Sequence, residues 1–96
     1  MRILGTIEHR DARIQVFQYG NRFSVKLEAG AYEQTYKFRE SPLIQGFDDI
    51  RKIVDDTFIA HAFRLFDQMH ALNGEGWQRF EAANLIAQGE AWEEII

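Results

Sequence analysis

The sequence predicts an α+β fold in which a four-stranded antiparallel meander sheet is followed by helices. Apolar and polar residues alternate through the first forty residues, and two-residue turn candidates recur every ten residues. From residue 47 onward, apolar residues recur at steps of three and four. Alternation with a period of two is typical of strands with one buried face, whereas steps of three and four are typical of an amphipathic helix.

Four strands are predicted, over residues 2–9, 12–19, 22–29 and 32–39. The loops between them are expected to be Arg10–Asp11, Gly20–Asn21 and Gly30–Ala31. Gly-Asn is a strong signal for a two-residue hairpin, Gly-Ala suits a turn with glycine first, and Arg-Asp is the weakest of the three. Together the loops predict three consecutive hairpins.

These loops set a register that assigns each side chain to one face of the sheet. The inner face, which a helix should cover, carries Val16, Val25 and Tyr36 in its central row. The outer face is acidic at one end and basic at the other. Its basic end holds two rows, Leu4, Phe17, Ser24, Lys37 and Arg2, Tyr19, Arg22, Arg39.

A long helix is predicted over about residues 47–72, followed by a second helix over about 77–88 and a short C-terminal helical tail. The long helix has one apolar stripe that should face the sheet, made of Phe47, Ile50, Val54, Phe58, Ala62, Leu65, Met69 and Leu72. Asn73–Gly74 is expected to end this helix, since either residue tolerates the left-handed conformation of a helix C-terminus.

Length and composition predict a single domain over residues 1–96, because 96 residues with 46% hydrophobic content can bury one core. The chain has no cysteine, which excludes disulfides and thiolate chemistry. No apolar run approaches the roughly 20 residues of a membrane span. We therefore expect a soluble, cytoplasmic protein with no membrane partner.

Charge is unevenly distributed along the chain. The net charge is −4, which argues against nucleic acid as a partner. Residues 1–40 hold seven Lys/Arg and five Asp/Glu, a net of +2, whereas residues 41–96 hold four and ten, a net of −6. This complementarity could serve packing within one chain or docking between two.

No motif predicts catalysis, a cofactor or a metal site. His61 is expected to be a core histidine, and His70 with Asp67 offers two possible metal ligands where a zinc site needs three or four. Ser24 and Ser41, the only serines, lack the sequence context of a nucleophile. We predict a non-enzymatic protein without cofactors.

The basic end of the outer sheet face is the first candidate site. It combines aromatic rings with cations, the residue types that bind anions beside a stacking platform. The candidate ligands are an anionic small molecule or an acidic protein segment. The simpler alternative is that long basic side chains merely lie over exposed rings. The candidate residues are Arg2, Phe17, Tyr19, Arg22, Lys37 and Arg39.

The second candidate site is an excess of large apolar residues toward the C-terminus. One alternative is internal: the second helix and tail cover the back of the long helix. The other is a homodimer interface, since a large exposed apolar patch usually marks an interaction surface. The candidate residues are Ile59, Phe63, Phe66, Trp77, Phe80, Trp92, Ile95 and Ile96. Self-association is the leading functional hypothesis, and the rival is a domain that binds an anion or small ligand, with or without catalysis, at the basic end of the outer sheet face.

Overall fold

The computed structural model describes the backbone of residues 1–95 and the side chains of residues 1–85. It divides into two compact units, residues 1–66 and residues 67–96. The first unit contains the whole sheet and the helical residues up to Phe66.

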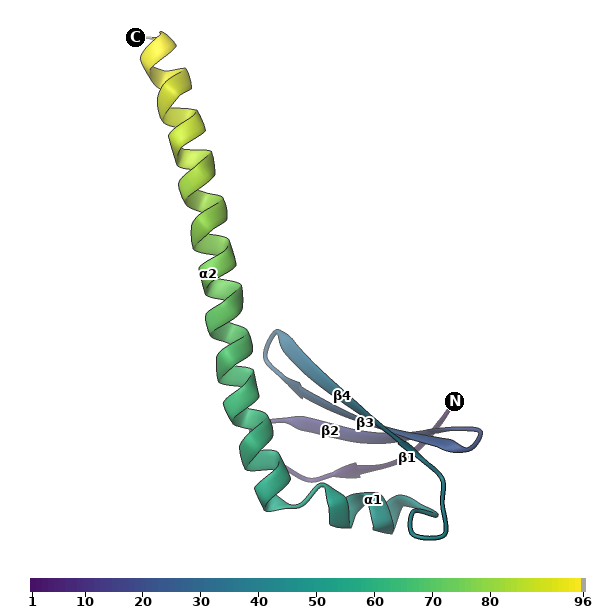
Figure 1. The fold of residues 1–96 in the computed structure, drawn as a ribbon. Coiled ribbons are helices and arrows are strands. Elements are labelled where there is room, and N and C mark those ends of the chain that lie inside the picture. The colour runs from purple at the N-terminus through teal and green to yellow at the C-terminus, as the bar shows by residue number, and fades with distance from the viewer. Residues whose placement is uncertain (96) are drawn as a thin grey trace. The chain divides into compact units, whose positions relative to one another are not determined.

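The first unit confirms the predicted α+β fold with a four-stranded antiparallel meander (Figure 1). The strands are β1 (Arg2–Ile7), β2 (Arg13–Tyr19), β3 (Arg22–Ala29) and β4 (Tyr32–Arg39), in the spatial order β1-β2-β3-β4. Gly20 and Gly30, with φ of 51° and 60°, open the two tight hairpins, as glycine allows at a positive φ.

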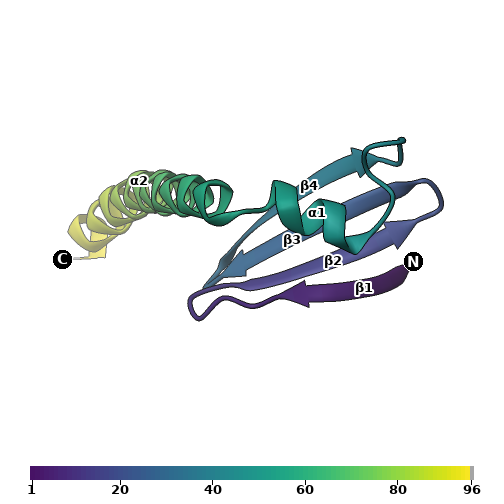
Figure 2. The ribbon, with the colours of Figure 1, turned by 90° about the horizontal axis from the view of Figure 1, so that it is seen from below.

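The predicted register holds across the second and third hairpins. Val16 pairs with Val25, and Val25 pairs with Tyr36. The inner face is therefore the buried one, and α1 lies across it (Figure 2). Its fully or nearly fully buried side chains are Ile7, Ile14, Val16, Phe23, Val25 and Leu27.

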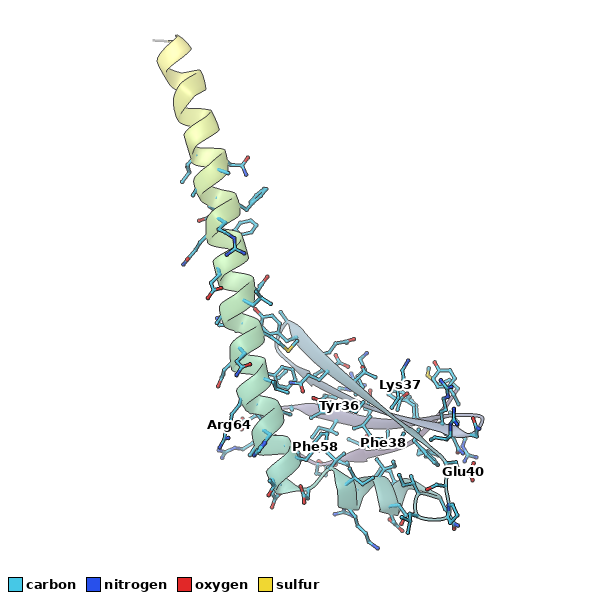
Figure 3. All side chains as sticks on the ribbon, viewed as in Figure 1. Tyr36, Lys37, Phe38, Glu40, Phe58 and Arg64 are labelled. Carbon is cyan, nitrogen blue, oxygen red and sulfur yellow. The ribbon has the colours of Figure 1, made fainter. Side chains whose placement is uncertain are left out.

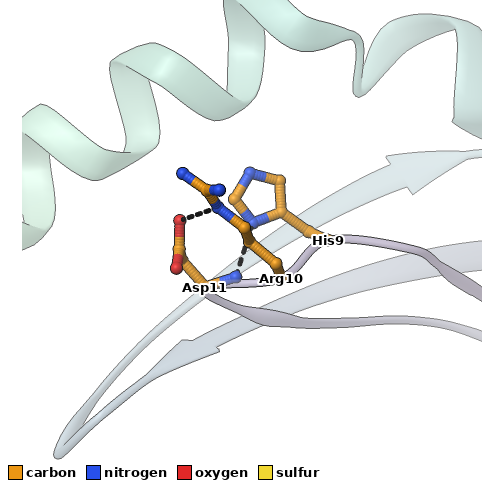
Figure 4. A network of polar contacts seen from close by, with 3 residues as sticks. All are labelled: His9, Arg10 and Asp11. Carbon is orange, nitrogen blue, oxygen red and sulfur yellow. Dashed lines mark hydrogen bonds and ion pairs between the residues drawn. The ribbon is translucent and has the colours of Figure 1, made fainter.

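The first hairpin differs from the prediction in its loop and its register. β1 ends at Ile7 and β2 begins at Arg13, so the loop covers residues 8–12. Within it, the Asp11 backbone N–H donates to Nδ1 of His9 at 3.1 Å (Figure 4). The register shifts between Ile3 and Gly5, which moves Ile3 opposite Phe17. This irregularity leaves Ile3 exposed, whereas an unbroken alternation would place its side chain on the inner face.

The predicted single helix over residues 47–72 is wrong because the chain breaks after its second turn. Helix α1 spans Phe47–Ile53, and α2 spans Asp56–Ile95. The N–H of Val54 still donates to the carbonyl of Ile50, at 2.9 Å, and closes α1. The carboxylate of Asp55 then accepts the N–H of Phe58 at 2.9 Å, which caps the start of α2.

The break changes which face of the second helix is buried. Ile59 and Phe66, predicted on the back of one long helix, are in the core, whereas Leu65 is exposed. Tyr36 and Phe58 meet edge to face with ring centroids 5.0 Å apart, and the two labelled side chains approach each other from β4 and α2 (Figure 3). Because α2 starts as a separate helix, it turns a different set of side chains toward the sheet than a continuous helix over residues 47–72 would.

The predicted helix end at Asn73–Gly74 and the separate helix over 77–88 are also wrong. α2 continues through both positions to Ile95. Among the described residues only Gly20 and Gly30 have positive φ, so Gly74 and Gly76 are not left-handed caps. Helical residues on both sides outweigh the cost of about 1 kcal/mol for each glycine. No helix among the described residues is long and apolar enough to cross a membrane.

We expect Gly5→Ala to lower the free energy of unfolding by about 1–3 kcal/mol, as overpacking does in a fitted contact. A Cβ at Gly5 would lie 2.8 Å from the ring of Phe47, so the ring has to move. Gly46→Ala is the matched control, since a Cβ there meets nothing within 4 Å. Chemical denaturation of both variants measures the difference, and equal stabilities would contradict the close contact.

Candidate functional site

The outer face of the sheet carries a hollow of about 460 Å³ at its basic end. We call this the outer hollow. β2, β3 and β4 supply most of its lining, because residues of one alternation point to the same face. The lining residues are Met1, Phe17, Tyr19, Arg22, Ser24, Lys26, Thr35 and Lys37.

The hollow exists because a small residue stands between large ones. Ser24 faces Phe17 on β2 and Lys37 on β4 across the strand pairs. Its side chain is short, and only 8% of the residue is exposed. The Phe17 ring and the Lys37 side chain therefore form two walls of the hollow, and Ser24 forms its floor.

Three cations at this end have no acidic partner among the side chains of residues 1–85. Arg22 pairs in register with Arg39, and Lys37 lies one row away on the same face. No ion pair among side chains 1–85 joins any of the three to a carboxylate. A second hollow of about 180 Å³ is lined by Arg22, Lys37, Phe38 and Arg39. The basic end is thus a continuous uncompensated positive surface.

Lys26 differs from these three cations because two carboxylates already compensate its positive charge. Its ammonium lies 3.3 Å from Glu33 and 3.4 Å from Glu28. The hydrogen bond to Glu33 and the charge of Glu28 raise the pKa of Lys26 above its ordinary value. Lys26 therefore keeps its positive charge to a higher pH than an ordinary lysine does.

The sequence predicted four of the eight lining residues: Phe17, Tyr19, Arg22 and Lys37. Arg39 lies in the adjoining smaller hollow. Arg2 lines neither hollow. The shifted register places Arg2 opposite Gln18, and its guanidinium donates a hydrogen bond to Oε1 of Gln18 at 3.0 Å. The other four lining residues are Met1, Ser24, Lys26 and Thr35, and the strand alternation places the last three on this face.

The second surface lies on α2 in the unit of residues 67–96. Leu72 is 65% exposed, and Trp77 and Phe80 are each 58% exposed. The rings of Trp77 and Phe80 lie together, with centroids 5.5 Å apart. Within residues 67–85, large apolar side chains thus point into solvent along one helix.

Residues at steps of four, three and four place Asn73, Trp77, Phe80 and Asn84 on one face of α2. We call these four residues the α2 seam. The indole N–H of Trp77 donates to Oε1 of Glu81 at 2.6 Å, and the Asn84 amide donates to the Phe80 carbonyl at 2.9 Å. Both bonds hold seam side chains along the helix surface.

The predicted interface residues fall into three groups. Ile59 and Phe66 are buried in the first unit, and Phe63 is half-buried with its ring stacked on His9 at 5.2 Å. Trp77 and Phe80 are exposed. The side chains of Trp92, Ile95 and Ile96 lie outside the described residues. Residues 77–88 belong to α2 and do not form a separate second helix.

The histidines are not gathered into a site. His61 is exposed rather than in the core, which corrects the expectation from sequence, and His70 is exposed as well. Among the described residues, no group of three or more His, Asp or Glu side chains is placed to hold a metal ion.

No protein-family model, curated protein or solved structure matches this chain.

Proposed function

We propose that this protein is a non-enzymatic interaction domain that self-associates through the α2 seam. Burial of an amphipathic face, rather than helix propensity, provides most of the stability of helices in proteins. Beyond residue 66 the seam has large apolar side chains in solvent, and exposed patches of this kind mark interaction surfaces. We also propose that the protein is soluble and cytoplasmic.

The observation that carries the proposal is the symmetry of the seam. Read from either end, the order is asparagine, three residues, aromatic, two residues, aromatic, three residues, asparagine, at positions 73, 77, 80 and 84. In a two-fold interface, residue i of one chain contacts residue j of the other, and j contacts i. Such a pattern fits a second copy of the same helix running antiparallel.

In this pairing, Trp77 of each chain packs against Phe80 of the other chain, so the contact occurs two times. Each Asn73 then faces an Asn84, so polar side chains meet polar side chains at both ends of the aromatic centre. A polar residue in an apolar helix seam favours the one register that pairs it. The aromatic pairs supply the affinity, and the asparagines supply the register.

Charge also favours the antiparallel direction. Residues 67–96 carry six carboxylates and a single cation, Arg79. Half of the carboxylates, Glu90, Glu93 and Glu94, fall near the end of the chain. A parallel pair would bring these two acidic ends together, whereas an antiparallel pair separates them and lowers the repulsion.

We expect Phe80→Asp to raise the dissociation constant of the dimer by at least about 30-fold, the effect of losing a central interface residue worth about 2 kcal/mol. The added carboxylate would be buried against Trp77 of the second copy without a partner. Sedimentation velocity over a concentration series measures this change.

Gln78→Asp is the control for Phe80→Asp. It adds the same charge on the same helix but off the seam, at an exposed position. Circular dichroism verifies that both variants keep their helix content. Equal weakening by the two variants, or a wild-type chain that stays monomeric, would contradict the proposal.

A further inference from the structure

We propose that the outer hollow, with the adjoining smaller hollow, binds a small phosphate monoester that carries a flat aromatic ring. This site is separate from the α2 seam and belongs to the first unit. Three features carry the inference: the uncompensated cations, the aromatic wall and the size of the hollow.

The cations point to an anionic group. Like charges directly opposite each other on neighbouring strands destabilise a sheet, and Arg22 and Arg39 occupy such a pair. Lys37 adds a third positive charge on the lining of both hollows. A bound anion would convert this repulsion into attraction, since arginine guanidinium groups bind phosphate in a fork of two hydrogen bonds.

The aromatic wall points to a ring attached to the anion. Phe17 and Tyr19 line the hollow from β2, and Tyr19 is opposite Arg22 in register. Phe17 and Lys37 are separated by the one strand that contributes Ser24, so their strands stand about 10 Å apart. This spacing fits a ring against Phe17 and Tyr19 with its phosphate among the cations.

Size and chemistry narrow the ligand class. About 460 Å³ lies within the range of roughly 300–1,000 Å³ for small-molecule sites. The hydroxyl-bearing residues Ser24 and Thr35 complete a lining that is part apolar and part hydrogen-bonding. Lys26 is neutralised by Glu28 and Glu33, so the positive charge is concentrated at the end next to the smaller hollow.

Phenyl phosphate is the probe, with inorganic phosphate and phenol as its two halves. We expect phenyl phosphate to bind more tightly than either, with amide shifts in NMR spectra confined to residues around the two hollows. Arg22→Gln should weaken phenyl phosphate at least about tenfold, because hydrogen bonds to charged groups are strong. Arg39→Gln is the second variant, in case Arg22→Gln perturbs the fold.

Two further variants separate the ring from the charge. Tyr19→Ala should weaken phenyl phosphate about fivefold or more and leave inorganic phosphate unchanged, since only the ring stacks on an aromatic side chain. Lys52→Gln removes a positive charge from exposed α1 and should change the affinity less than about twofold, as expected for a distant screened charge.

Loss of binding in Arg22→Gln and retention in Lys52→Gln would support the site. Equal weakening in both variants, or phenyl phosphate binding no better than inorganic phosphate, would overturn it and leave only general attraction to a positive surface. The dimer mass of Arg22→Gln, measured in parallel, tests self-association independently, because Arg22 lies outside the α2 seam.

Discussion

Phe23→Ala is expected to lower the free energy of unfolding by about 3–5 kcal/mol, the usual cost of removing a buried phenyl ring. Phe23 has 0% exposure and is among the largest fully buried side chains. It lies between Gln18 and Phe38 in register on the inner face. A loss of this size is a large part of the 5–15 kcal/mol typical of a domain.

Phe17→Ala is the matched control, because it removes the same ring from the opposite face of the same hairpin. Phe17 is half-buried, so we expect a loss of about 1 kcal/mol, near the centre of the range for point mutations. Urea denaturation at one protein concentration compares the two. A larger loss for Phe17→Ala would mean that the inner and outer faces are exchanged.

Gly76→Pro is expected to destabilise α2 by about 3 kcal/mol and to abolish self-association. Proline in a helix interior removes one backbone hydrogen bond and clashes with the preceding turn. Gly76 lies inside α2, between Asn73 and Trp77 of the seam. Circular dichroism should show lost helix content, and sedimentation should show a monomer.

Gly74→Ala serves as the opposite test of the same helix. A Cβ at Gly74 meets nothing within 4 Å, and its backbone is helical. Alanine should therefore stabilise α2 by roughly 0.5–1 kcal/mol. If residues 73–76 were instead a helix end with a left-handed glycine, alanine at 74 would destabilise the chain, and proline at 76 would be tolerated.

The sheet could be predicted because its signals are local. Alternation and glycine-containing turns specify strands and register together, and a slip of one residue would expose Val16 and Val25. The irregularity in β1 could not be predicted, since Leu4 and Ile3 are both apolar and suit either face. It also displaced Arg2 from the predicted site.

The ends of the helices could not be predicted, because at each boundary one sequence signal favours continuing the helix and another favours ending it. The apolar stripe runs unbroken across Val54, but the carboxylate of Asp55 caps a new helix there. At Asn73 and Gly74, residue types typical of a helix end are overridden by helix-favouring neighbours. The candidate surfaces were located by alternation and apolar content, whereas the symmetry of the seam becomes meaningful only when α2 is one helix.

Disulfide cross-linking of engineered cysteines tests antiparallel self-association most directly, because the chain has no cysteine of its own. Asn73→Cys and Asn84→Cys are eleven residues apart, about 16 Å along the helix, and a disulfide requires Cα atoms within about 7 Å. An equimolar mixture of the two variants should form a covalent heterodimer, while neither variant should cross-link with itself. Cross-linking of Asn73→Cys to itself, or no cross-linked dimer in the mixture, would contradict the antiparallel seam.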